Sequence, residues 1–158
     1  MQVSPALIII SIVMTCTTGE KLMSKTFIDT NIVVYANDMR DPEKQKTAVN
    51  LIAALMDSGG GVISTQVLQE YAVTALQKLQ QRPDVVIRMI AILENLEVIQ
   101  QSPEMIRKAV ELKTLYHISF WDACIISNAE AAGCSTIVSE DLNSGQFYSG
   151  IAVINPFI

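Results

Sequence analysis

Short apolar runs alternate with longer amphipathic stretches along most of the chain. The apolar runs lie at residues 26–28, 62–64, 96–99, 136–138 and 151–154, and their lengths fit buried strands. The stretches between them repeat their apolar residues at helical spacing. Strands separated by helices predict an α/β fold with a central, mostly parallel sheet of four to five strands, covered by helices on both faces.

Residues that favour helix ends mark the limits of the amphipathic stretches. Ser, Thr, Asp and Asn favour the start of a helix, Pro fits its first turn, and Gly favours the position after its last turn. Asp29, Thr30 and Asn31 form one such start, directly after the first apolar run. The predicted helices cover residues 32–36, 43–57, 66–80, 82–93, 103–116 and 119–132.

The chain has the length and composition of one domain, which we predict over residues 23–158. It has 158 residues, and 50% of them are hydrophobic, enough for a single packed core. Residues 1–22 form a separate N-terminal extension with an apolar run at 6–14 that is too short to span a bilayer and has no basic start. We expect translation to begin at Met23; an export signal and a tail are the alternatives.

The charge of the chain limits how it can hold a nucleic acid. The formal net charge is −5, so no basic field over the whole molecule attracts phosphate, and such a substrate must be bound locally. The basic residues are scattered at helical positions, where we interpret each as solvated surface charge: Lys44, Lys46, Lys78, Arg82, Arg107 and Lys108.

The cysteines indicate a reducing compartment. The spacing of Cys16, Cys124 and Cys134 matches neither a metal site nor a disulfide framework. Cys124 and Cys134 fit small core residues. We therefore expect a cytoplasmic protein with no membrane partner.

Four acidic residues map to the same edge of the predicted sheet. Asp29 ends the first strand, Glu70 lies in the helix after the second, Asp122 starts the helix before the fourth, and Asp141 follows the fourth. In an open parallel sheet, ligands bind at the carboxyl ends of the strands. Each acid alone also has an ordinary interpretation, as a helix cap, a surface residue or a turn residue. It is their convergence that indicates a site.

Asp122 is the most informative of these acids. Ile125, Ile126 and Ala129 continue its helical stripe and are apolar. A carboxylate there needs a partner, and no Lys or Arg follows Lys113. A metal ion would fill that role. Oxygen ligands favour Mg²⁺ or Mn²⁺ over Zn²⁺, since His117, interpreted as a helix-end residue, and the cysteines fall at no matching position.

Several sequence blocks together resemble the PIN-domain family, and within it the VapC-type toxin ribonucleases of toxin–antitoxin pairs. Each block alone is weak, but their order and spacing are specific, and they span nearly the whole domain. The blocks are residues 27–31 (FIDTN), 33–36 (VVYA), 63–70 (ISTQVLQE), 119–123 (SFWDA), 139–142 (SEDL) and 153–157 (VINPF).

The resemblance implies a PIN-like three-layer α/β/α fold and a metal-dependent endoribonuclease that hydrolyses RNA phosphodiester bonds. It also implies a Mg²⁺ cofactor, with Mn²⁺ possible, a cognate antitoxin that covers the acidic cleft, and a second copy of the chain as a homodimer partner. The implied catalytic and metal-binding residues are Asp29, Glu70, Asp122 and Asp141, with Asn31 and Ser139 as supporting residues.

Two other function classes compete with this interpretation. One is a catalytically silent PIN-like binding or regulatory module, which metal-dependent cleavage would distinguish. The other is a phosphoacceptor signalling domain, which also places Asp and Mg²⁺ at the strand ends of a parallel sheet. That class pairs two acids after the first strand and has a late lysine, whereas here Thr30 and Asn31 follow Asp29.

Overall fold

The computed structural model describes residues 24–158. Our expectations for the N-terminal extension at residues 1–22 and for a start at Met23 concern residues outside this range. Within it, the α/β class and the central, mostly parallel sheet are confirmed.

The sheet has six strands in the order β3-β2-β1-β4-β6-β5. All neighbouring pairs are parallel except β5 and β6. The first three strands along the chain move outward to one edge, and the chain then returns to the other side of β1. The strands are β1 (Lys25–Ile28), β2 (Gly61–Ser64), β3 (Glu97–Ile99), β4 (Cys134–Val138), β5 (Phe147–Tyr148) and β6 (Ile151–Ile154).

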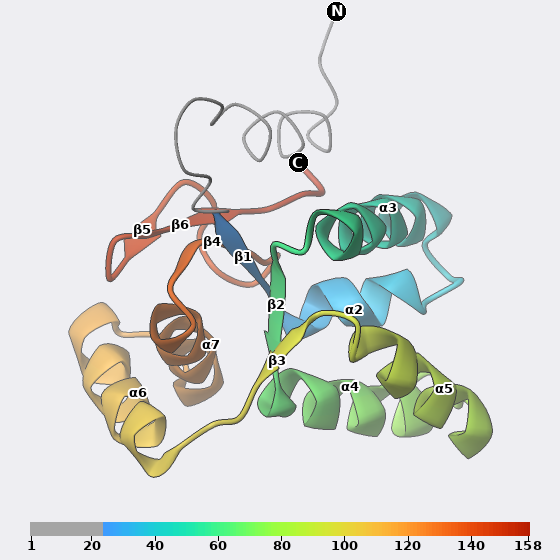
Figure 1. Cartoon of the computed structure of the whole chain (residues 1–158), viewed down its shortest axis with the longest axis horizontal. Helices are drawn as coiled ribbons and strands as arrows, with labels where there is room; N and C mark the ends of the chain where they lie inside the picture. Colours follow the sequence, from blue (N-terminus) through green and yellow to red (C-terminus); the bar gives the residue numbers. More distant parts are fainter. Residues whose placement is uncertain (1–23) are drawn as a thin grey trace, which may run out of the picture.

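Helices cover both faces of this sheet (Figure 1). Crossovers between parallel strands are right-handed, so the outward path from β1 to β3 puts its helices on one face and the return to β4 puts its helices on the other. Figure 1 shows α2 to α5 on one side of the sheet and α6 with α7 on the opposite side. The helices are α2 (Thr30–Ala36), α3 (Pro42–Ser58), α4 (Thr65–Gln77), α5 (Pro83–Leu93), α6 (Pro103–Tyr116) and α7 (Phe120–Ala131).

Polar residues at the strand ends start the helices that follow. The side chains of Asp29, Ser64 and Ser119 accept hydrogen bonds from backbone N–H groups in the first turns of α2, α4 and α7. Each bond satisfies a donor that the helix itself leaves unpaired. Helix α4 ends at Gln77, three residues before the expected end, and Gln80 has a φ of 52° that a helix cannot contain.

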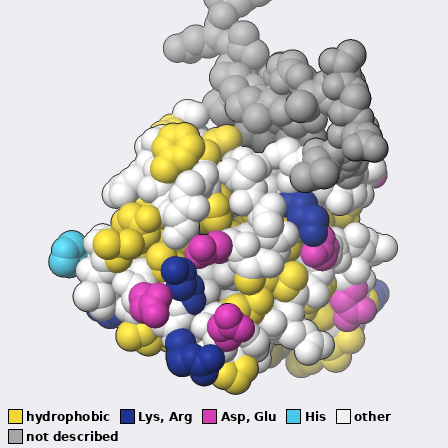
Figure 2. Space-filling view, turned by 60° about the vertical axis from the view of Figure 1, so that its left-hand side comes forward, with side chains coloured by type: hydrophobic (Ala, Val, Ile, Leu, Met, Phe, Trp, Pro, Cys, Tyr) yellow, Lys and Arg dark blue, Asp and Glu magenta, His cyan; other side chains and the backbone are white. Residues whose placement is uncertain are grey.

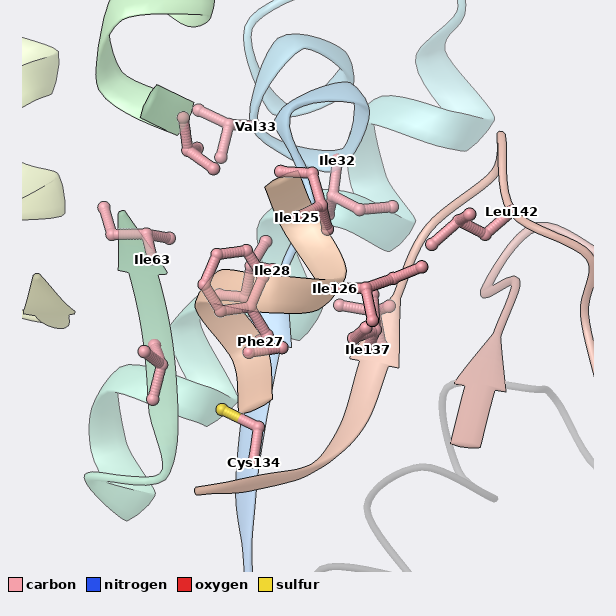
Figure 3. Packing of buried hydrophobic residues seen from close by; sticks show 14 of the residues in the cluster. Phe27, Ile28, Ile32, Val33, Ile63, Ile125, Ile126, Cys134, Ile137 and Leu142 are labelled. Carbon is pink, nitrogen blue, oxygen red and sulfur yellow. The ribbon is translucent and has the colours of Figure 1, made fainter. Parts of the chain in front are cut away.

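The core lies on both faces of the central strands. Phe27, Ile28 and Ile137 are fully buried on the sheet, and Ile125 and Ile126 of α7 pack over them (Figure 3). Consecutive residues of β1 and β2 are buried, as expected for strands covered on both sides. Cys124 and Cys134 are buried and free, in agreement with their interpretation as core residues.

The short strand β5 is the element that the hydrophobic pattern missed, which is why the sheet has one strand more than the four to five expected. It has only two residues, and Phe147 is 64% exposed. A turn containing Ser149 and Gly150, both at positive φ, joins it to β6. Two residues at an open edge show no alternation from which a strand could be predicted.

No helix in residues 24–158 is both long enough and apolar enough to cross a bilayer.

Gly61 provides a test of the packing between α3 and the sheet. An added Cβ would lie 2.5 Å from Leu96 Cδ2 and 2.9 Å from Leu55 Cβ. We expect Gly61→Ala to lower the free energy of unfolding by about 1–3 kcal/mol because the core must shift to accept the methyl group. Urea denaturation measures this loss. Gly60→Ala is the matched control, since its nearest atom would be 3.3 Å away, and an equal loss in both variants would contradict the prediction.

Candidate active site

The candidate site lies where the carboxyl ends of β1 and β4 adjoin. These strands are neighbours in the sheet, with Ile28 opposite Val138, although more than a hundred residues separate them in the sequence. The chain leaves β1 toward one edge and β4 toward the other, so a crevice opens between their ends. The strand order also differs from the 2-1-3-4-5 order of receiver-type signalling domains.

A pocket of about 730 Å³ opens at this edge. The four acids predicted from the sequence all line it, and so does Asn31; Ser139 lies fully buried beside them and does not reach the surface of the pocket. The structure therefore brings together, around one cavity, Asp29 directly after β1 and side chains from α2, α4, α7 and the loop after β4. The lining acids are Asp29, Glu70, Asp122 and Asp141.

Asp29 is buried at the floor of the pocket, with 5% of its surface exposed. One carboxylate oxygen accepts the Thr30 backbone N–H at 2.6 Å; the other accepts the Ser139 hydroxyl at 2.6 Å and the Asn31 amide at 3.1 Å. Burial raises the pKa of Asp29 to about 7, and the charges of Asp141 and Asp122 add to the rise, while the bonds from Ser139 and Thr30 oppose it.

Asn31 and Ser139 connect this buried acid to the loop after β4. The Asn31 amide nitrogen donates to Asp141 Oδ2 at 3.0 Å, and Asn31 Oδ1 accepts the Glu140 backbone N–H at 3.3 Å. Ser139 Oγ accepts the backbone N–H of Asp141 at 3.1 Å. Both side chains thus hold the exposed Asp141 beside Asp29.

Glu70 is half-buried and held by two donors. Its carboxylate accepts the Thr30 hydroxyl at 2.7 Å and the Gln66 amide at 2.9 Å. The fully solvated position that is usual for a glutamate is therefore not the one observed. Thr30 binds Glu70 through its side chain and Asp29 through its backbone, so this residue ties the two acids to the start of α2.

A buried amide network lies behind Glu70. Asn128 of α7 donates to Gln66 Oε1 at 3.1 Å and to Ser64 Oγ at 3.2 Å, and all three residues are at most 3% exposed. The network joins β2, α4 and α7 under the pocket. Sequence reasoning missed Thr30, Gln66 and Asn128; the available signal for Asn128 was a polar side chain within the otherwise apolar stripe of its helix.

Asp122 differs from the other acids in having an open carboxylate. Its backbone N–H donates to Ser119 Oγ at 3.0 Å, which is the first half of the expected capping box. Its half-buried carboxylate accepts no hydrogen bond from any residue in 24–158. The carboxylate therefore faces the pocket rather than closing the helix end.

Basic side chains near the pocket are mostly paired with acids. Lys44 bonds Glu140 and, at 3.1 Å, the Tyr35 hydroxyl, and it lies 4.4 Å from the centre of the Tyr35 ring. Burial would raise the pKa of Glu140, but the bonds from Lys44 and Tyr35 outweigh it and lower that pKa. Lys44 thus holds Glu140, the residue before Asp141, in place. The sequence had suggested only a solvated surface charge at Lys44.

Lys78 is the one scattered basic residue named from the sequence that lines the pocket. Arg40, which was not among those residues, also lines it. Arg40 forms a two-pronged ion pair with Asp38, through bonds of 2.8 and 2.7 Å. Side-chain hydrogen bonds from Arg40 lower the pKa of Asp38 to about 2, so this pair stays charged. On the face shown in Figure 2, Lys and Arg side chains lie beside Asp and Glu and form no continuous basic surface.

The donor set fits Mg²⁺ or Mn²⁺ by its chemistry, since every candidate ligand is a carboxylate oxygen. The buried charge of Asp29, with two further acids raising its pKa, is a charge that a cation would stabilise. Within residues 24–158, however, no three Asp, Glu, His or Cys side chains lie close enough together to hold a metal as they stand. Proteins commonly hold Mg²⁺ through only one or two carboxylates, with water as the remaining ligands.

Comparisons with known proteins agree on one fold. A family model described as "PIN domain" matches residues 26–148. Among solved structures, VapC20 of Mycobacterium tuberculosis, described as a Sarcin-Ricin loop cleaving toxin, is 19% identical with a TM-score of 0.56, over 72% of this chain and 87% of that one. None of the curated proteins matches the chain significantly.

Two further structures cover more of the chain. A toxin–antitoxin complex from Klebsiella pneumoniae is 20% identical with a TM-score of 0.62, over 84% of this chain and 98% of that one. VapBC2 from Rickettsia felis, bound to a DNA fragment from its promoter, is 22% identical with a TM-score of 0.59, over 81% and 96%. At these identities the similarity shows the fold alone.

The buried carboxyl of Asp29 predicts a pH dependence of stability in the metal-free protein. Its folded pKa of about 7 lies above the ordinary aspartate value of 3.8, so its stabilising contribution is complete below pH 4 and is lost as the pH rises through 7. The loss amounts to roughly 2–4 kcal/mol. We expect Asp29→Asn to remove this slope in urea denaturation with EDTA. Asp57→Asn, at an exposed site, is the control, and an unchanged slope in Asp29→Asn would refute the assignment.

Proposed function

Because the chain belongs to the PIN-domain family, we propose that it is a metal-dependent endoribonuclease and the VapC-type toxin of a toxin–antitoxin pair. The observation that carries the proposal is the single pocket lined by Asp29, Glu70, Asp122 and Asp141 at the strand-end edge. Four carboxylates around one cavity repel each other unless a cation is present. A cation held there could stabilise the negative charge of an RNA phosphodiester during its hydrolysis, which makes RNA the proposed substrate.

The four pocket carboxylates would hold Mg²⁺, or Mn²⁺ in its place. When bound, the ion supplies positive charge that stabilises the attacking and leaving oxygens during phosphodiester hydrolysis. Hydrogen bonds within the chain orient the carboxylates that would bind this ion. Ser139 and Asn31 orient Asp29 and Asp141, while Thr30 and Gln66 orient Glu70.

Asp122 has a further role in this proposal. Because its carboxylate accepts no hydrogen bond within residues 24–158, its oxygens are open to water in the pocket. The carboxylate can therefore accept a proton from the attacking water. The buried amides of Gln66 and Asn128 keep α4 and α7 in register, so that Glu70 and Asp122 face the same cavity.

The proposed partners are RNA, a cognate antitoxin and a second copy of the chain. The comparison structures support the antitoxin, because the proteins from Klebsiella and Rickettsia are toxin–antitoxin assemblies. The buried free thiols of Cys124 and Cys134 support a reducing compartment, so we place the protein in the cytoplasm.

One observation favours the alternative of a catalytically silent binding module. The acids of residues 24–158 form no ready-made metal group, and a PIN-like domain that has lost catalysis could keep the same pocket. Metal-dependent cleavage distinguishes the two functions, because a silent module that keeps the four acids can still bind an ion but does not hydrolyse RNA.

Cleavage of RNA tests the nuclease directly. We expect the full chain to cut cellular RNA into discrete fragments with Mg²⁺ or Mn²⁺ and to leave it intact with EDTA. Asp29→Ala and Asp122→Ala should each lower the rate at least about 100-fold. The first removes a buried carboxylate that would bind the metal ion, and the second removes the carboxylate that is open to water. Gel analysis of the fragments measures the rate and maps the cut bond.

Glu104→Ala, an exposed acid at the start of α6, is the control for the loss of one carboxylate. Cleavage that persists in both active-site variants would come from a contaminant. If neither metal supports cleavage nor raises the melting temperature of the folded protein, the silent module becomes the better assignment.

The antitoxin is predicted to act by covering the acidic pocket. A basic side chain from a partner would meet the carboxylates there and replace the cation. We expect co-expression with the product of an adjacent open reading frame to yield a stable complex without ribonuclease activity. Size-exclusion chromatography and the cleavage assay measure the two effects. A purified protein that binds no such product would lose the toxin assignment and keep the nuclease.

A further inference from the structure

Trp121 is an exposed aromatic residue on the rim of the acidic pocket. It is 61% exposed, lines the pocket and directly precedes Asp122. Most other large exposed hydrophobic residues lie elsewhere on the protein, outside this pocket. An indole left open at the rim of a pocket lined by carboxylates offers a flat aromatic face to a ligand that enters the pocket.

The backbone of Trp121 is fixed although its ring is open. The Ser119 side chain caps the start of α7 by accepting the backbone N–H of Asp122. The amide nitrogen of the buried Gln66 donates a hydrogen bond to the Trp121 carbonyl oxygen at 3.4 Å. The Phe120 ring, half-buried against the core, meets the indole edge-to-face with 5.6 Å between centroids. The ring is thus supported at its side, and little conformational entropy is lost when a flat ligand stacks on it.

Two cationic groups line the same pocket. Arg40 uses Nε and Nη2 to bind Asp38, so its Nη1 stays available in the described part of the chain. Lys78 forms no ion pair within residues 24–158, whereas six other basic residues there are paired. These cationic groups can bind RNA phosphates that lie on either side of the four acids.

We propose that Trp121 forms a nucleobase subsite: it stacks on the base next to the cleaved phosphate, while Arg40 and Lys78 bind the flanking phosphates. This inference rests on the proposed ribonuclease function and adds a residue that selects the substrate. A base within a duplex has both faces covered by its neighbours, so the subsite takes a base that is unpaired or turned out of its stack.

A nucleobase fits this place better than a side chain of a protein partner. Exposed tryptophans also serve as anchors between proteins, but such anchors sit at the centre of an apolar patch. Trp121 instead shares its pocket with four carboxylates and with Arg40 and Lys78. A phosphodiester bound at the carboxylates necessarily brings its own bases to the rim of the pocket.

The test couples the tryptophan to the base. The RNA is a short single strand containing the mapped cut site, with an abasic ribose placed on either side of the cut in turn. We expect Trp121→Ala to lower kcat/KM roughly 5- to 100-fold, the usual effect of removing one stacked base contact. One of the two abasic RNAs should lower kcat/KM of the wild type by a similar factor. The same RNA should lower kcat/KM of Trp121→Ala hardly at all.

Two variants separate stacking from general damage. Trp121→Phe keeps an aromatic face and should retain most of the activity. Val73→Ala removes another exposed apolar side chain from the same pocket, at 54% exposure, and should leave the abasic penalty unchanged. Equal abasic penalties in the wild type and Trp121→Ala would overturn the subsite. So would normal cleavage by Trp121→Ala together with lost binding of an antitoxin, which would assign Trp121 to a protein interface.

Fluorescence separates this proposal from the nuclease assignment. Trp121 is the single tryptophan of the chain, so its emission reports directly on stacking. With Mg²⁺ and a Glu70→Gln variant to prevent cleavage, we expect oligoadenylate to quench the emission and an abasic strand of equal length to leave it unchanged. This result would support the subsite even if the wild type cleaved no RNA tested. Equal responses to both strands would reject it.

Discussion

The structure depends on one constraint, the burial of a carboxylate at the end of the central strand. Asp29 starts α2 and is also the floor of the pocket, so the same side chain serves the fold and the site. Three donors, from Thr30, Asn31 and Ser139, surround it, yet burial still raises its pKa to about 7. Without a counter-charge, the edge where the sheet opens is destabilised at neutral pH.

The other polar contacts follow from that constraint. Asn31 extends the hydrogen bonding from Asp29 to Asp141, and Thr30 extends it to Glu70. Behind Glu70, the amides of Gln66 and Asn128 carry the connection to α7 and so to the helix of Asp122. Because buried amides left unpaired are costly, this network fixes how the helices on the two faces of the sheet approach each other.

The sequence predicted most of the fold and the place of the site, because both depend on strong periodic signals. Buried strands are apolar runs, and their carboxyl ends must share an edge, so Asp29 and Asp141 could be placed together from spacing alone. Strand β5 was missed because two edge residues carry no pattern. The network of Gln66 and Asn128 was missed because helical spacing does not show which partner an amide bonds, even where, as at Asn128, the residues on the same stripe are apolar. Whether the four acids act as ligands stays a prediction.

The negative charge of the chain explains why its binding features concentrate at one pocket. With a formal charge of −5, the molecule as a whole repels a polyanion, and six basic side chains of residues 24–158 form ion pairs with acids. If the chain binds RNA as we propose, its affinity must then come from groups that act at short range. A cation among the carboxylates, the free charge of Lys78 and the open face of Trp121 are such groups, and stacking is the one among them that salt does not screen. In the nuclease that we propose, the base exposed at the cut would therefore contribute more to the choice of RNA than attraction to the phosphates does.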